Sequence, residues 1–197
     1  MFENEIILKI RNYVIENSEK NDIHGFSHVE RVYNTCVRIG QNLKANLKVL
    51  KIAAYLHDIG RIDEDNDSYK RNHAEISAEK ARKFLTSNNF NLSGKAIDNI
   101  IHAIKAHSFS NKIVPLNLEA KILSDADKLD AIGAIGIYRT IGFTLQNNGG
   151  IKQVIEHLEN KILKLKDKLY LDYSKKIANE RHQIVLEFYN KLKKERL

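Results

Sequence analysis

Apolar residues recur at intervals of three and four along most of the chain, the spacing that places side chains on one face of an α-helix. No stretch shows the alternation of a β-strand, and no internal repeat is apparent. One Pro and nine Gly among 197 residues leave little to interrupt helices. The pattern predicts an all-α helical bundle that forms a single domain over residues 1–197.

The helix ranges follow from the apolar stripes and from residues that favour helix ends. The expected helices cover residues 3–18, 27–40, 46–60, 72–85, 93–107, 117–133, 151–169 and 177–188. Ser27 and Glu30 fit a capping box at the start of the second helix. Asn46 is the expected N-cap of the third, and Gly60 is expected to end it in the left-handed conformation. Residues 63–71 are expected to form a polar loop.

The adjacent pair His57-Asp58 closes a helix whose other inward positions are apolar. His57 follows Ala53 by four residues and Ala54 by three, so it shares their core-facing stripe. Burying a polar pair is costly unless the pair finds partners. A metal ion is the partner that uses an imidazole and a carboxylate together.

Helix phase points to further inward polar residues. His28 and His73 each lie in the first turn of a helix, and His107 follows Ile104 by three residues on an apolar stripe. Asp127 has apolar residues four positions before and after it. A lone inward histidine is more often a hydrogen-bonded core residue than a ligand, and a buried aspartate can instead cap a helix or pair with a cation. The metal hypothesis therefore rests on several such residues converging.

Three segments carry a resemblance to a known family: Gly25–Val32 (GFSHVERV), Ala53–Arg61 (AAYLHDIGR) and Asp125–Gly136 (DADKLDAIGAIG). An isolated His, a His-Asp doublet and a distant Asp in a helical chain resemble the HD-domain superfamily of metal-dependent phosphohydrolases. The resemblance covers most of residues 20–140. It is closest to small stand-alone members, some similar to nucleoside-triphosphate pyrophosphohydrolases. Residues 150–197 match nothing named and are expected to complete the bundle.

The resemblance implies one divalent metal ion with two imidazole and two carboxylate ligands. These ligands are His28, His57, Asp58 and Asp127. Such a set suits Mn, Fe, Co, Ni or Mg and leaves Zn open. The ion would activate water for attack on a nucleotide or a related phosphate ester or anhydride, and Asp58 is the expected proton acceptor.

The chain departs from some relatives just after the doublet. Relatives that hydrolyse guanosine tetraphosphate, and the family's 5′-nucleotidases, place a Glu four residues after the doublet's His, where this chain has Arg61. Whether Asp63 or Glu64 substitutes for that Glu is open. Arg61 is expected to be a catalytic cation facing the phosphate, and Lys128, beside Asp127, a substrate contact. For Lys128 a surface ion pair is an equal alternative.

His73 and His107 lie at positions similar to those at which HD proteins with several metal ions bind a second ion. They can equally donate hydrogen bonds to a substrate phosphate, or have a structural role only. Substrate contact is favoured because four ligands already suffice for hydrolysis with one metal.

Charge and hydropathy limit the expected partners. The net charge is +7, and residues 151–197 hold 12 Lys and Arg against seven Asp and Glu. No basic run interleaved with aromatic residues accompanies this charge, so a phosphate-bearing small molecule is expected rather than nucleic acid. Residues 1–9 lack the apolar core of a signal peptide, and no apolar run is long enough to span a bilayer. A cytoplasmic protein without membrane contact is therefore expected.

Two other classes of function remain open. One is an HD module that binds nucleotide or metal as a sensor without turnover, although the intact ligand set argues against decay. The other is a basic helical protein that binds nucleic acid through residues 151–197, which steep salt dependence of binding would reveal.

Overall fold

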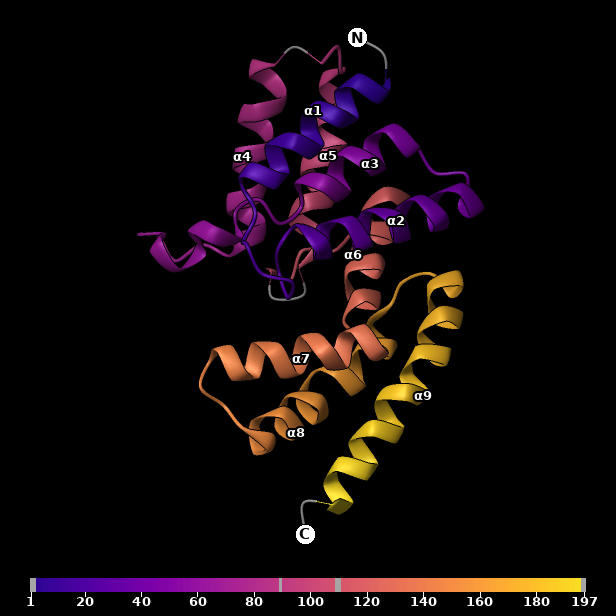
Figure 1. Cartoon of the computed structure of the whole chain (residues 1–197). Helices are drawn as coiled ribbons and strands as arrows, with labels where there is room; N and C mark the ends of the chain where they lie inside the picture. The colour runs from indigo at the N-terminus through magenta and orange to yellow at the C-terminus, as the bar shows by residue number, and fades with distance from the viewer. Residues whose placement is uncertain (1–2, 89, 109–110, 196–197) are drawn as a thin grey trace. The chain divides into compact units, whose positions relative to one another are not determined.

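A computed structural model describes residues 3–88, 90–108 and 111–195 of the chain. In these ranges every regular element is helical, which confirms the predicted all-α class (Figure 1). The helices are α1 (Glu3–Glu16), α2 (Phe26–Leu43), α3 (Leu47–Leu56), α4 (His73–Ser87), α5 (Gly94–His107), α6 (Leu118–Asp130), α7 (Ala134–Gln146), α8 (Ile151–Asn160) and α9 (Asp172–Glu195), with 3-10 helices η1 (Arg61–Asn66) and η3 (Ile162–Lys168).

The chain divides into two compact units, residues 1–124 and 125–197, and the division falls inside α6. That the whole chain forms a single domain stays a prediction. No helix of the described ranges has the length and apolarity needed to cross a membrane.

In the first unit α3 is the central helix, packed against α1, α2 and α5 (Figure 1). Its side chains are buried almost all round, which is typical of a helix enclosed by other helices. The side chain of Asn46 caps it, accepting a hydrogen bond from the backbone N–H of Val49 at 3.2 Å, as the sequence predicts. Because α3 runs through the core, the residues at its C-terminal end emerge inside the protein.

The end of α3 differs from the expectation. Gly60 has φ of −94°, so the predicted left-handed cap is wrong. Glycine is needed there for space: an added Cβ would lie 2.5 Å from the backbone nitrogen of Ser77 and 2.8 Å from Cβ of Ile76. The Gly60 N–H also donates to Ser77 Oγ at 2.9 Å. This contact brings the turn after the doublet directly against α4.

Other differences concern helix ends. The second helix begins one residue early, with Gly25 as N-cap and no side-chain cap, so the capping box at Ser27 is wrong. Part of the expected polar loop forms η1. Helix α7 over residues 134–146 is not among the predicted helices, and the helix expected over 151–169 is broken at Lys161 into α8 and η3.

In the second unit α8 and α9 pack against each other and against η3 and α7. Gly133 separates α6 from α7 with φ of +98°, a conformation that favours glycine. Arg181 on α9 donates to the carbonyl of Leu129 at 2.6 Å, near the end of α6, and the same carbonyl accepts the backbone N–H of Ile132 at 3.2 Å.

Candidate metal centre

Four histidines from four helices surround one carboxylate, that of Asp58. Oδ2 of Asp58 lies 3.6 Å from Nε2 of His28 on α2 and 3.8 Å from Nε2 of His57 at the end of α3. Oδ1 lies 3.6 Å from Nε2 of His73 on α4 and 3.5 Å from Nε2 of His107 on α5. All five side chains are buried. The first unit thus brings together five of the predicted site residues.

The ring orientation of two of these histidines is fixed by their own helices. His57 Nδ1 donates to the carbonyl of Ala54 at 2.7 Å, and His107 Nδ1 donates to that of Ile104 at 2.6 Å. In each case the acceptor lies three residues earlier, at the C-terminal end of a helix where carbonyls lack intrahelical partners. With the proton on Nδ1, Nε2 presents a lone pair toward Asp58. This is the tautomer that ligates metal ions through Nε2.

Arg61 lies directly on the same carboxylate. Its Nε donates to Oδ2 of Asp58 at 2.8 Å, and its Nη2 to Oδ1 at 3.2 Å. The same Nη2 lies 3.2 Å from Nε2 of His73. The predicted cation is therefore part of the cluster.

The surroundings decide the charge of the cluster. Burial alone would raise the pKa of Asp58, but the Arg61 guanidinium and the neighbouring imidazoles together hold it well below its usual range. Burial lowers the pKa of His73, which outweighs the opposite effect of the Asp58 carboxylate. The favoured state is an ionised Asp58 beside a neutral His73.

The donor set fits a divalent metal ion. His28, His57 and Asp58 form one group of ligand atoms that all lie within 4.8 Å of one another, and Asp58, His73 and His107 form a second. Ligands bonded to one ion at about 2.1 Å lie about 3.0–3.5 Å apart, close to the spacing of these atoms. The Nε2 lone pairs and the ionised Asp58 carboxylate repel one another, so a cation bound between the nitrogen atoms and the carboxylate would stabilise the cluster. The cluster could hold a metal ion, and its chemistry favours a borderline or hard cation.

Asp127 and Lys128 lie on α6 within the second unit. Asp127 is half-buried and belongs to neither group of described ligand atoms, so its role as the fourth ligand stays a prediction. Lys128 is buried, with its ammonium 5.5 Å from the ring centre of Tyr170, and burial lowers its pKa. Its expected contact with substrate stays a prediction. The alternative placed it at the surface, where it does not lie, although the Asp127 and Asp125 carboxylates act on its charge.

Two acidic residues have contacts that helix phase does not predict. Asp125 is fully buried and accepts the backbone N–H groups of Tyr170 and Leu171 at 2.8 and 2.9 Å, an anchor within the second unit. Glu64 on η1 accepts from the backbone N–H of His73 at 3.0 Å and lies 3.2 Å from its Nδ1. The only signal for Glu64 in the sequence is its closeness to the doublet.

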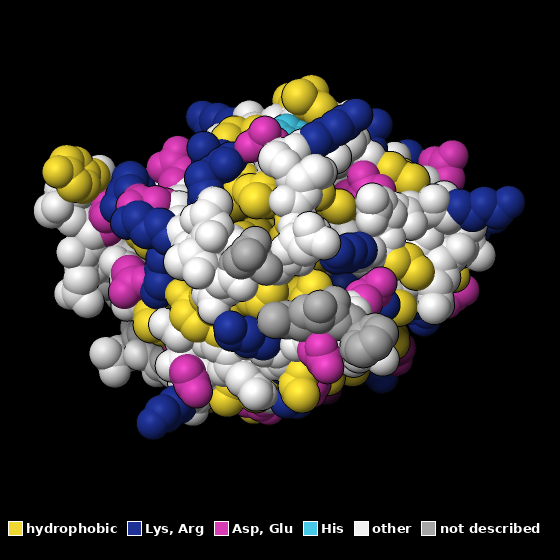
Figure 2. Space-filling model, turned by 90° about the horizontal axis from the view of Figure 1, so that it is seen from above, with side chains coloured by type: hydrophobic (Ala, Val, Ile, Leu, Met, Phe, Trp, Pro, Cys, Tyr) yellow, Lys and Arg dark blue, Asp and Glu magenta, His cyan; other side chains and the backbone are white. Residues whose placement is uncertain are grey.

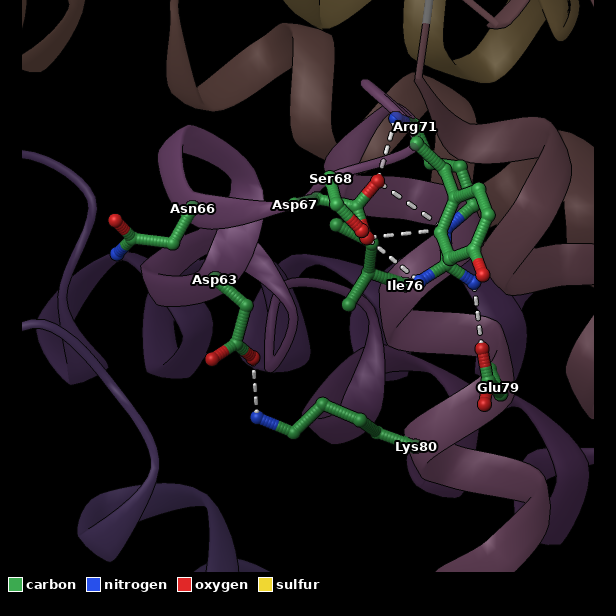
Figure 3. A pocket seen from close by; sticks show the side chains of 9 residues that line it. Asp63, Asn66, Asp67, Ser68, Arg71, Ile76, Glu79 and Lys80 are labelled. Carbon is green, nitrogen blue, oxygen red and sulfur yellow. Dashed lines mark hydrogen bonds and ion pairs between the residues drawn. The ribbon is translucent and has the colours of Figure 1, made fainter.

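A pocket lies between η1, which carries Glu64, and α4 (Figure 3). Its charged side chains pair with one another: Asp63 with Lys80 at 2.7 Å, and Arg71 with both Asp67 and Glu79. These contacts occupy the charges that would otherwise attract an ionic ligand.

The sequence matches the HD domain family over residues 25–132, and the chain belongs to that family. The uncharacterized protein YpgQ of Bacillus subtilis is 32% identical over 186 residues, which cover 90% of this chain and 87% of YpgQ. The crystal structure of YpgQ in complex with ADP has a TM-score of 0.79 at 30% identity and covers 99% of this chain and 97% of that one. A predicted HD superfamily hydrolase from an uncultured Thermotogales bacterium has a TM-score of 0.69 at 28% identity, with 97% and 91% covered. The fold is that of an HD-superfamily hydrolase.

Proposed function

We propose that the protein is a metal-dependent phosphohydrolase that acts on a nucleotide or a related phosphate compound. The observation that carries this proposal is the buried carboxylate of Asp58, with two histidines at each of its oxygens. The YpgQ complex with ADP supports a nucleotide as the class of ligand.

In the proposed site His28, His57, Asp58 and Asp127 hold one divalent ion. When bound, the ion lowers the pKa of water and withdraws charge from phosphorus. Asp58 accepts the proton of the attacking water. Arg61, whose guanidinium contacts Asp58, stabilises negative charge that develops on the phosphate.

His73 and His107 lie on the other oxygen of Asp58 and complete the wall of the site. In our proposal they contact the substrate phosphate, which requires a proton on Nε2 of each ring as well as on Nδ1. Binding of a second ion is the alternative, and it uses the Nε2 lone pair of the neutral rings. The identity of the ion is left to experiment, with Mn, Mg, Co, Ni, Fe and Zn as candidates.

The test is a screen of Mn, Co, Ni and Mg against nucleoside mono-, di- and triphosphates, with the products identified as phosphate or pyrophosphate. His57→Ala should reduce the rate by about 100-fold or more, since it removes a metal ligand. His102→Ala is the matched control: this histidine also lies on a helix of the first unit, but it accepts from the backbone N–H of Leu116 instead. Asp58→Ala should lose metal in elemental analysis while staying helical. Full metal occupancy in that variant would rule out the assignment.

A sensor that binds nucleotide without turnover is the second candidate, because the ADP complex of YpgQ is an observation of binding. Tight nucleotide binding by the wild type with no product in any arm of the screen would favour it. Nucleic-acid binding through residues 151–197 is the remaining alternative, which steep salt dependence of binding would reveal. On the face in Figure 2, which is seen from above Figure 1, Lys and Arg side chains are interspersed with acidic ones. The described residues visible there form no continuous basic patch.

A further inference from the structure

The Nδ1 atoms of His57, His107 and His73 each face a hydrogen-bond acceptor, but the acceptor does not come from the same place in all three. His57 caps the C-terminus of α3 and His107 is the last residue of α5, and each donates Nδ1–H to the carbonyl three residues earlier. His73 is the first residue of α4. A residue at the start of a helix has no preceding helical carbonyl within reach, so the acceptor for His73 Nδ1 must come from another element.

Glu64 on η1 provides that acceptor. Its Oε2 lies 3.2 Å and its Oε1 3.3 Å from Nδ1 of His73, and Oε1 also accepts the backbone N–H of His73 at 3.0 Å. One carboxylate thus holds both the ring and the main chain of the same residue. A negative charge at the N-terminus of α4 is also favourable for the helix.

The contact of His73 with Arg61 determines which atom donates in its contact with Glu64. A guanidinium has donors only, and Nη2 of Arg61 lies 3.2 Å from Nε2 of His73. Nε2 of the neutral ring must therefore present its lone pair, which places the proton on Nδ1. The Nδ1–H group then donates to Glu64. Contacts on opposite sides of the ring require the same tautomer.

We infer that Glu64 is a positioning residue, which sets the tautomer and orientation of His73 so that Nε2 faces Asp58 and the reaction centre. The inference rests on the proposed function for its catalytic consequence. It does not rest on that function for the tautomer itself. Glu64 acts through His73 and needs no contact with substrate or metal.

The direct test is the tautomer of His73 in the chelator-treated, uniformly ¹⁵N-labelled protein, read from long-range ¹H–¹⁵N correlations at about pH 8, above the usual histidine pKa of about 6.5. A His73→Gln spectrum assigns the signals. We expect Nδ1–H in the wild type and in Glu64→Gln, whose side-chain oxygen still accepts. Arg61 favours the same tautomer through Nε2, so the effect of Glu64 is measured in an Arg61→Ala background. In that background the Nδ1–H form should persist with Glu64 present, and the Nε2–H form should become populated in the Arg61→Ala, Glu64→Ala double variant.

Asp63→Asn is the matched control. It lies on the same 3-10 turn and loses an ion pair, but its partner is Lys80 (Figure 3). It should leave the tautomer of His73 unchanged. An Nε2–H tautomer in the wild type overturns the inference even if Glu64→Ala fails to fold. An unchanged tautomer in a folded Arg61→Ala, Glu64→Ala double variant overturns it as well.

The consequence for the site is measured by Mn²⁺ titration and by steady-state kinetics. Removing the hydrogen-bond partner of a metal-bound histidine costs about 10–100-fold in metal affinity or activity. For His73 the loss should fall on Mn²⁺ affinity if the ring binds a second ion, and on kcat/KM alone if it contacts the phosphate. We expect a loss of that size in Glu64→Ala, with Glu64→Gln and Asp63→Asn close to the wild type. Equal losses in Glu64→Gln and Glu64→Ala would contradict positioning by hydrogen bonding. A wild type without turnover would refute the proposed function but leave the tautomer result standing.

Discussion

The close approach of Gly60 to α4 gives a quantitative prediction for Gly60→Ala. The backbone of Gly60 is in an ordinary conformation, so the cost of the substitution comes from space alone. The new Cβ would meet the Ser77 backbone nitrogen at 2.5 Å and the His73 carbonyl oxygen at 2.9 Å. Neither atom can rotate away as a flexible side chain would. Overpacking typically costs about 1–3 kcal/mol, and we expect the upper end, about 3 kcal/mol.

Urea unfolding followed by far-UV circular dichroism measures this loss. With a denaturant slope of about 2 kcal/mol per M, a loss of about 3 kcal/mol lowers the midpoint by about 1.5 M. Gly94→Ala is the matched control, since it also lies in the first unit and an added Cβ there meets nothing within 4 Å. It should change stability by less than about 0.5 kcal/mol. Equal midpoints for the two variants would refute the reasoning from close contact.

Two further predictions concern buried polar groups. Asp125→Ala leaves the N–H groups of Tyr170 and Leu171 without their carboxylate acceptor and should lower the free energy of unfolding in urea by about 3 kcal/mol or more. The control Asp167→Ala, at an exposed position, should lower it by less than about 0.5 kcal/mol. Similar losses in the two variants would contradict a stabilising role for the Asp125 hydrogen bonds. His107→Ala should keep the metal content of the wild type while KM rises or kcat falls, as expected for a substrate contact. If elemental analysis instead finds two ions in the wild type and one in the variant, His107 is a ligand of a second ion.

The sequence predicts the helices best where one apolar stripe meets one cap. Helix α3 is such a case, because Asn46 marks its start and Leu50, Ala53 and Ala54 mark its buried face. The break after α8 is not readable in this way. A 3-10 helix keeps residues three apart on one face, so the apolar spacing of Leu158, Ile162 and Leu165 continues through the change from α8 to η3.

Helix phase fails for α6, because burial there is not confined to one stripe. The consecutive residues 122–126 are all buried, so periodicity cannot separate an inward carboxylate from an outward one. The sequence singles out Asp127, which is half-buried, and passes over Asp125, which is fully buried. The partners of Asp125 lie 45 and 46 residues away, a distance that no local pattern encodes.

In the metal centre too, contacts within one helix can be predicted from sequence and contacts between different elements cannot. His57 and His107 can be found from sequence because the apolar stripe that buries each ring and the carbonyl that orients it belong to one helix. Glu64 cannot be found in this way, since it orients a ring nine residues away on a different element. Nothing periodic links η1 to α4; their contact depends on the absence of a side chain at Gly60. That glycine therefore contributes to the chemistry indirectly, because it lets the turn that carries Arg61 and Glu64 approach the helix that carries His73.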